Sequence, residues 1–362
     1  MFRKFSSMIR HTSHVTTILF VVGFVIDMII LPDIDHPLTR YIGLAHLTVV
    51  AILIMFREWV VSRNTASKLE QKLYSLSSFG ISFSSGAALS FICVYAFRSA
   101  ALSVSWPLFL ILAVCIIANE FVSTHGFRLA LDVGILLIAS LFFAIFNIPV
   151  LLKVQNDVTF LISTAVTVVF SIVYVYLLQF TSESAKEETP KIFALALGIP
   201  MFVGMLYILN VIPAVPLSLN HAGVYHSVIR TSEGAFIVYA EKEDGIFLRR
   251  LIPFRTLVYH MTSTDSGVYF FSAVHAPAEI TAPLSHVWEE YDEKKKQWVE
   301  RSVISFGLEG GRRDGYRAYS FKESIDEGLW RVSVKVDTKR VVGRYTFFVE
   351  RKESVILEKD SL

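Results

Sequence analysis

Long apolar runs separated by short polar connections occupy the first 214 residues of the chain. A membrane-crossing helix needs about 20 mostly apolar residues, and seven runs approach or reach that length. They cover residues 15–32, 41–61, 78–97, 102–121, 129–150, 158–180 and 192–214. This half therefore predicts an α-helical multi-span membrane bundle of about seven transmembrane helices.

The third run differs from the others because its centre, SSFGISFSSGAALS, is rich in Ser and Gly. Small residues allow two membrane helices to approach closely, which predicts a tight helix–helix seam. The alternative is a re-entrant segment that lines a cavity.

The pattern changes near residue 221, where helical periodicity gives way to short segments rich in β-branched and aromatic residues. Polar or Gly-containing breakers such as TSTDSG and EGGRRDG separate them. In RVSVKV (331–336) the three valines alternate with polar residues, as in a strand with one buried face. The pattern predicts an all-β domain, either an antiparallel, Ig-like β-sandwich or a partly open barrel. Eight strands are expected, at 224–230, 235–240, 267–274, 284–291, 297–306, 316–321, 329–336 and 340–350.

Two prolines, Pro213 and Pro216, stand between the two patterns and favour a stiff, extended connection. We therefore expect a transmembrane helical domain at 1–214, a Pro-containing membrane-exit linker at 215–222, and an extracytoplasmic β-sandwich domain at 223–362.

Composition supports this division. Charged residues make up 18% of the 362 residues and mean hydropathy is +0.53, against about 25% charged residues in soluble proteins. Residues 1–220 hold 13 Lys+Arg and 11 Asp+Glu, and the remaining residues hold 21 of each. This balance gives no electrostatic footprint for nucleic acid. Both cysteines, Cys93 and Cys115, fall in apolar runs, so the β domain needs no disulfide.

The positive charges of the connections predict an orientation, because Lys and Arg accumulate on the cytoplasmic side. With the N-terminus in the cytoplasm, three basic residues lie outside: Arg40, Arg98 and Lys153. Ten lie inside: Arg3, Lys4, Arg10, Arg57, Arg63, Lys68, Lys72, Arg128, Lys186 and Lys191. Seven spans then place the β domain in the periplasm.

Several segments together resemble a known family. HVW (286–288), GGRRDGYRAYSFK (310–322), GLWRVSVKV (328–336) and GRYTFFVE (343–350) resemble the bacterial domain of unknown function 2914. GFVIDMIIL (23–31), GAALSFICVYAFRSA (86–100), Asn119-Glu120-Phe121 and IPAVPLSLNHAGVYH (212–226) resemble its membrane-anchored members, although Ala214 replaces an expected proline. The resemblance implies an inner-membrane multi-span region followed by a C-terminal β-rich domain, and it implies no activity.

One candidate ligand site follows Gly310, where Arg312, Arg313 and Arg317 lie close together. Arginine forks match carboxylate and phosphate geometry, so these residues would bind a phosphate, a uronic acid or an anionic lipid headgroup. The alternative is a hairpin whose arginines pair with nearby glutamates, namely Glu289, Glu290 or Glu309.

Aromatic residues provide a second part of the candidate site. If exposed, His286, Trp288 and Tyr316 would offer contact area and stacking platforms for sugar rings; if buried, they are core aromatics. In the membrane half, Asp27, Glu120 and Asp132 would form a proton or cation relay. The alternative for these acids is interhelical hydrogen bonding.

Motifs for catalysis and cofactors are missing from the sequence. The histidines show no metal-ligand spacing such as HExxH, and neither a GxSxG elbow nor a Walker, dinucleotide or haem motif occurs. We therefore assign no catalytic residue, no metal and no cofactor.

The sequence favours an integral protein of the bacterial inner membrane that binds an envelope component through its outer domain. Its partners would be the lipid bilayer and an envelope glycan, an anionic lipid headgroup or a periplasmic protein. The alternatives are a transporter or channel component and an envelope-modifying enzyme.

Overall fold

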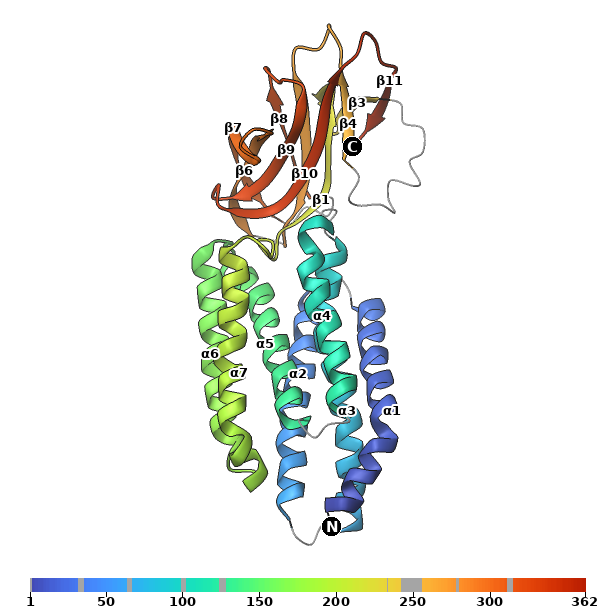
Figure 1. Cartoon of the computed structure of the whole chain (residues 1–362), viewed down its shortest axis with the longest axis vertical. Coiled ribbons are helices and arrows are strands. Elements are labelled where there is room, and N and C mark those ends of the chain that lie inside the picture. The colour runs from blue at the N-terminus through green and yellow to red at the C-terminus, as the bar shows by residue number, and fades with distance from the viewer. Residues whose placement is uncertain are drawn as a thin grey trace. The chain divides into compact units, whose positions relative to one another are not determined.

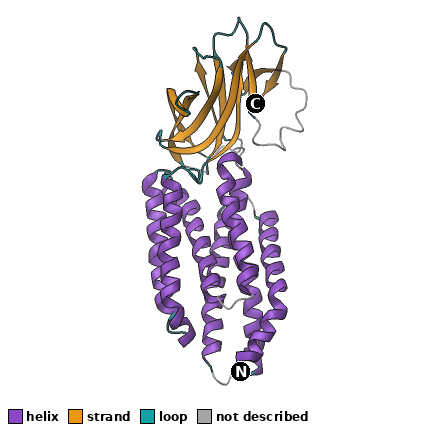
Figure 2. Cartoon of the chain, in the orientation of Figure 1, coloured by secondary structure: helices purple, strands orange, loops and turns teal. Residues whose placement is uncertain are grey.

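The computed structural model describes residues 2–31, 36–63, 67–98, 102–123, 128–232, 234–241, 256–277, 280–310 and 315–362. The chain divides into two compact units, one built of helices and one built of strands (Figure 2). The helical unit comprises Met1–Ala96, Pro107–Leu152 and Asp157–Leu209. The second, or β unit, comprises Phe97–Trp106, Lys153–Asn156 and Asn210–Leu362.

The described part of the helical unit has seven helices that run side by side (Figure 1). They are α1 (Phe2–Ile30), α2 (Pro37–Ser62), α3 (Lys68–Arg98), α4 (Leu102–Ser123), α5 (Arg128–Leu152), α6 (Asp157–Leu178) and α7 (Glu183–Ile208). Four of the described helices, α2, α5, α6 and α7, are long and apolar enough to cross a membrane. The apolar parts of α1 and α4, Val15–Ile30 and Trp106–Ala118, are shorter.

Over most of its length, helix α6 buries a stripe of Ser and Thr and exposes apolar side chains, the reverse of a helix on a soluble protein; Val175 and Leu178 near its end are buried. Thr159, Ser163, Thr167 and Ser171 form its buried stripe. Each of the last three hydroxyls donates to the carbonyl four residues earlier, at 2.7–2.9 Å. Such local hydrogen bonds satisfy polar groups without water, and the exposed apolar face suits a hydrocarbon environment.

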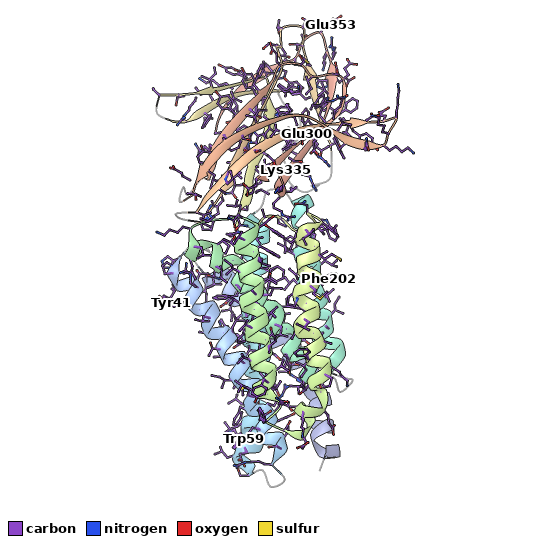
Figure 3. All side chains as sticks on the ribbon, turned by 90° about the vertical axis from the view of Figure 1, so that its left-hand side faces the viewer. Tyr41, Trp59, Phe202, Glu300, Lys335 and Glu353 are labelled. Carbon is purple, nitrogen blue, oxygen red and sulfur yellow. The ribbon has the colours of Figure 1, made fainter. Side chains whose placement is uncertain are left out.

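Aromatic side chains also mark the two ends of α2. Tyr41 and Trp59 are exposed and point away from the bundle (Figure 3). They are separated by five helical turns of 3.6 residues, so they lie on one face about 27 Å apart along the axis. The hydrocarbon core of a bilayer is about 30 Å thick, and Trp and Tyr concentrate at its two boundaries. The spacing therefore fits a helix that crosses one bilayer.

The Ser- and Gly-rich run lies in α3, which is a continuous helix packed closely against α1. A Cβ added to Gly86 would collide with the carbonyl oxygen of Phe20, and one added to Gly23 would collide with that of Phe83. The two glycines thus allow backbone-to-backbone approach, as expected for the seam interpretation of this run.

The described part of the β unit has eleven strands in three sheets. The strands are β1 (Ser218–Tyr225), β2 (Ser227–Arg230), β3 (Phe236–Glu241), β4 (Leu257–Met261), β5 (Val268–His275), β6 (Thr281–Asp292), β7 (Gln297–Glu309), β8 (Tyr316–Lys322), β9 (Gly328–Val336), β10 (Arg340–Arg351) and β11 (Leu357–Ser361). The five-stranded sheet has the order β4-β10-β9-β6-β7, and the three-stranded sheets are β1-β5-β8 and β11-β3-β2.

The core lies between the five-stranded sheet and the sheet β1-β5-β8. Phe270 of β5 makes ring contacts with Trp288 of β6 and Tyr345 of β10. Val332, Val334 and the third valine of the alternating segment are buried, as the pattern predicts. Seven of the eight expected strands each coincide with one observed strand, whereas the segment expected as a strand at 224–230 covers the end of β1 and all of β2. Strands β4 and β11 were not expected. Strand β4 pairs in parallel with β10, so the unit is not wholly antiparallel.

The Pro-containing segment that follows α7 belongs to the β unit, which includes Asn210–Leu362. Ala214 and Val215 are buried, the Val215–Pro216 peptide is cis, and the Ala214 amide donates to Val341 O at 2.9 Å. Strand β1 begins at Ser218, so the segment that we expected to be a linker at 215–222 is largely part of the β unit.

Candidate binding site in the β unit

A groove of about 720 Å³ lies in the β unit. Its lining combines the start of β6, the end of β7, the start of β8, the turn after β9, and the short connection between α5 and α6. The lining residues are Val154, Gln155, Asn156, Thr281, Ala282, Pro283, Gly307, Leu308, Glu309, Tyr316 and Asp337.

The connection between α5 and α6 is fixed to β6 by backbone hydrogen bonds. The Thr281 amide donates to Lys153 O at 3.0 Å, and the Gln155 amide donates to Thr281 O at 3.4 Å. Val154 and Thr281 thereby form a short parallel bridge. Four residues that join two apolar helices thus complete one wall of a groove in the β unit.

The charged groups of the groove are acidic. Glu309 and Asp337 are exposed, and neither carboxylate has an ion pair or a hydrogen-bond donor among the described residues. The backbone amide of Asp337 donates to Pro283 O at 3.0 Å, which fixes the turn that carries this carboxylate. The described lining includes no Lys, Arg or His. A ligand with hydrogen-bond donors or positive charge is complementary to such a surface.

Gln155 adds an unsatisfied acceptor. Its residue surface is 2% exposed, and its buried Oε1 atom has no hydrogen-bond partner in the described part of the chain. A buried acceptor without a donor costs about 1–3 kcal/mol. Native proteins rarely retain such groups without a role, so this side chain marks a position where a ligand donor would be stabilising.

The arginine part of the predicted site is largely outside the described residues. Arg312 and Arg313 fall in the segment 311–314, which the structure does not describe. Arg317 donates to Leu362 O at 3.1 Å. Tyr316 does line the groove, with its ring parallel to that of Phe306 at a centroid distance of 6.3 Å.

His286 and Trp288 lie in the core, so we leave them out of the binding surface. Both are 0% exposed. His286 Nε2 and Ser272 Oγ are 2.8 Å apart, and Nδ1 lies 2.9 Å from Ser320 Oγ. Ser320 also accepts the Trp288 indole N–H at 3.1 Å. Burial lowers the pKa of His286 to about 3, so this neutral ring joins β6 to β5 and β8.

Glu289 pairs with an arginine of the neighbouring strand rather than with the predicted arginine segment. Arg331 makes two 2.8 Å hydrogen bonds to its carboxylate, and Ser333 donates to Oε2 at 2.6 Å. Burial alone would raise the pKa of Glu289, but these donors outweigh it and lower the pKa. The Arg331 guanidinium also lies 4.2 Å from the ring centroid of Trp298. This network is fully paired and stabilises one sheet face.

A second titratable cluster joins the ends of β3 and β4. His226 Nδ1 lies 3.0 Å from Asp265 Oδ1, and its Nε2 lies 3.6 Å from Glu241 Oε1. Glu241 Oε2 lies 2.6 Å from His260 Nδ1. The Tyr259 hydroxyl is 3.2 Å from His226 Nδ1. Among the described residues, no group of three or more His, Cys, Asp or Glu side chains is arranged to hold a metal ion.

The acids predicted to form a relay fall in separate environments. Asp132 accepts a hydrogen bond from Arg57, whereas Asp27 Oδ1 lies 3.5 Å from His46 Nε2. Along α2, His46 and Arg57 are about 16 Å apart. The side chain of Glu120 lies outside the described residues. The described contacts therefore place Asp27 and Asp132 in two sites rather than in one continuous chain.

Sequence reasoning missed the groove itself. Gln155, Asp337 and the start of β6 come from distant parts of the chain, and nothing in their local patterns links them. The charge pattern gave no signal either, because Arg312 and Arg313 lie near Glu309 in the sequence, and Lys335 and Lys339 lie near Asp337.

Comparisons with known proteins identify the domain that carries most of this groove. Residues 282–349 match the family described as "Protein of unknown function (DUF2914)". The C-terminal part of the chain thus carries a domain of this family, which confirms the resemblance there. No curated protein matches the chain.

One solved structure is similar to the chain only at a very low level. It is the Pseudomonas fluorescens alkylpurine DNA glycosylase AlkC bound to DNA containing an abasic site analog. The identity is 10% and the TM-score 0.19, over 88% of this chain and 99% of that chain. A TM-score this low carries no argument about fold or function.

Proposed function

We propose that this chain is a multi-pass protein of the bacterial inner membrane whose extracytoplasmic β unit binds an envelope component. The observation that carries the proposal is the groove, which combines the DUF2914 domain with the four-residue connection between two apolar helices. Its unpaired acceptors suit recognition, and the described residues around it present no nucleophile–base pair.

The orientation in this proposal rests on the distribution of Lys and Arg, with ten basic residues on the proposed cytoplasmic side and three outside. Single cysteines test it in a variant that lacks Cys93 and Cys115. A membrane-impermeant maleimide added to intact spheroplasts should label Thr338→Cys, in the exposed turn after β9, and should spare Lys186→Cys at the start of α7. The reverse labelling would overturn the orientation.

The binding role is tested with a photo-crosslinking residue placed in the full-length protein in cells. Pro283 is exposed and lines the groove, whereas Val258 of β4 is exposed and lies outside it. Illumination should capture an envelope molecule at position 283 and not at position 258, and mass spectrometry would identify it. Equal capture at both positions, or none at either, would contradict a recognition site in the groove.

Transport is the second candidate, and the Asp27–His46 pair is the observation that favours it. His46 lies about 7 Å along α2 from Tyr41 and about 20 Å from Trp59. In the proposed topology, with these two aromatic residues at the membrane boundaries, the pair would lie at hydrocarbon depth. Asp27 Oδ2 is buried without a hydrogen-bond partner in the described residues. Ionisable pairs at this depth commonly serve ion pathways. A stable Asp27→Asn variant with unchanged proton flux in liposomes would remove this candidate.

A further inference from the structure

We propose that the groove binds a primary ammonium group, of which the phosphoethanolamine headgroup is the membrane-borne form. This inference deepens the proposed binding function and rests on it. Three features of the described residues carry it: two unpaired carboxylates, one buried unpaired amide, and a wall that belongs to the connection between two apolar helices.

The carboxylates supply the charge. Glu309 at the end of β7 and Asp337 in the turn after β9 both line the groove, and no described cation neutralises either. They contrast with Glu289, whose oxygens are fully occupied by Arg331 and Ser333. An ammonium group carries one positive charge and three N–H donors, which matches two carboxylates and one further acceptor.

Gln155 supplies that further acceptor. Its side chain lines the groove, is nearly fully buried, and has no hydrogen-bond partner among the described residues. Hydrogen bonds also require donors on the ligand. This requirement separates a primary ammonium from a trimethylammonium, which has the same charge but no N–H.

The chain itself places this chemistry near a membrane surface. Val154 is two residues beyond the last residue of α5, and Asn156 is next to the first residue of α6. Two residues of extended chain span at most about 7 Å, and both helices are long and apolar enough to cross a bilayer. A group within that distance of two span ends lies at headgroup level.

The experiment uses the full chain in nanodiscs made from equal parts of phosphatidylethanolamine, phosphatidylcholine and phosphatidylglycerol. Native mass spectrometry measures which lipids stay bound. The wild-type protein should retain the ethanolamine lipid over the choline lipid by about tenfold, the ratio expected for charge-assisted hydrogen bonds. Glu309→Gln and Asp337→Asn should each bring the ratio close to one.

One control variant and one further test variant complete the experiment. Glu300→Gln removes an exposed carboxylate of the same strand β7 (Figure 3). Glu300 does not line the groove, so this variant should keep the wild-type ratio. Gln155→Leu replaces the unpaired amide by an apolar side chain of similar size. It should lower the ratio while leaving the unfolding temperature unchanged or higher, because no hydrogen bond is lost.

Free ethanolamine distinguishes the two sources of the ammonium group. For this test, the nanodiscs contain only the choline and glycerol lipids, and calorimetry measures the binding of free ethanolamine. Binding to the wild-type protein that is lost in Asp337→Asn would support an ammonium site that takes a soluble ligand. Equal retention of ethanolamine and choline lipids together with no binding of ethanolamine would overturn the inference. If the ammonium inference fails but crosslinking at position 283 captures a different molecule, the proposed binding function is retained. If crosslinking captures nothing, the ammonium inference and the binding function are both rejected.

Discussion

Arg57 of α2 donates a hydrogen bond to Asp132 of α5, 75 residues further along the chain. Both side chains are buried. Glu58 Oε1 lies 3.5 Å from the Arg57 Nε atom, and Arg128 Nε lies 3.7 Å from Asp132 Oδ2. Two arginines and two carboxylates thus form a cluster without net formal charge, which makes a structural role for Asp132 the simpler interpretation.

Asp132→Asn should destabilise the helical unit because it leaves Arg57 as a buried charge without its main partner. Removing one member of a buried ion pair costs about 3–5 kcal/mol. Thermal unfolding of the purified protein in detergent measures the loss. The double variant Arg57→Met/Asp132→Leu should recover most of it, since apolar replacement of a whole pair is often neutral. Wild-type stability combined with lost flux in Asp132→Asn would favour the relay instead.

Gly86→Ala should separate α1 from α3. The added Cβ would collide with the Phe20 backbone carbonyl, which cannot move away as the end of a side chain could. We expect a fall of several degrees in the unfolding temperature in detergent. The matched control is Gly204→Ala in α7, where an added Cβ meets nothing within 4 Å. This control should be neutral or slightly stabilising, because Ala favours a helix by up to about 1 kcal/mol.

The strand pattern was predictable wherever one face of a strand is buried. The valines of β9 alternate with polar residues, and this alternation can be read from a few consecutive residues. Strand β11 has no such pattern, since all five of its residues are exposed, and it forms only by pairing with β3. The parallel pairing of β4 with β10 joins segments about 90 residues apart, which no local pattern records.

The candidate site was less predictable for a related reason. His286 lies in phase with Leu284 and Trp288 at every second residue of β6, so its inward direction was visible in the alternation. The groove is different, because a lack of partners cannot be read from sequence. Glu289 pairs with Arg331 of the neighbouring strand, whereas Glu309 has no such partner among the described residues. This difference depends on which strands become neighbours.

Ser272→Ala should destabilise the β unit because His286 Nε2 would then lose its partner at the centre of the core. An unpaired buried group costs about 1–3 kcal/mol. Denaturant unfolding of the full chain, followed by tryptophan fluorescence, measures the change. Ser361→Ala is the matched control, since this serine is exposed on β11. The control should change stability by less than about 0.5 kcal/mol. Equal losses would contradict the importance of the buried network.

His226→Gln should destabilise the β unit more at low pH than at high pH. Burial alone would lower the pKa of His226, but Glu241 and Asp265 outweigh it, so the pKa is raised above 6.5. A raised pKa gives stability that is complete below about pH 6.5 and is lost as pH rises through the folded value. The expected difference in stability is about 1.4 kcal/mol for each unit by which the pKa is raised.

Unfolding temperatures of wild type and variant, measured between about pH 5 and pH 8, test this sign. Hydrogen bonds from His226 and His260 overcome burial and lower the pKa of Glu241 to about 2, so this carboxylate stays ionised over the whole range. His286, whose pKa burial lowers, titrates identically in both proteins and cancels from the comparison. The stability gap should be widest near pH 5 and should narrow towards pH 8. A gap that widened with rising pH would show that His226 is neutral in the folded protein.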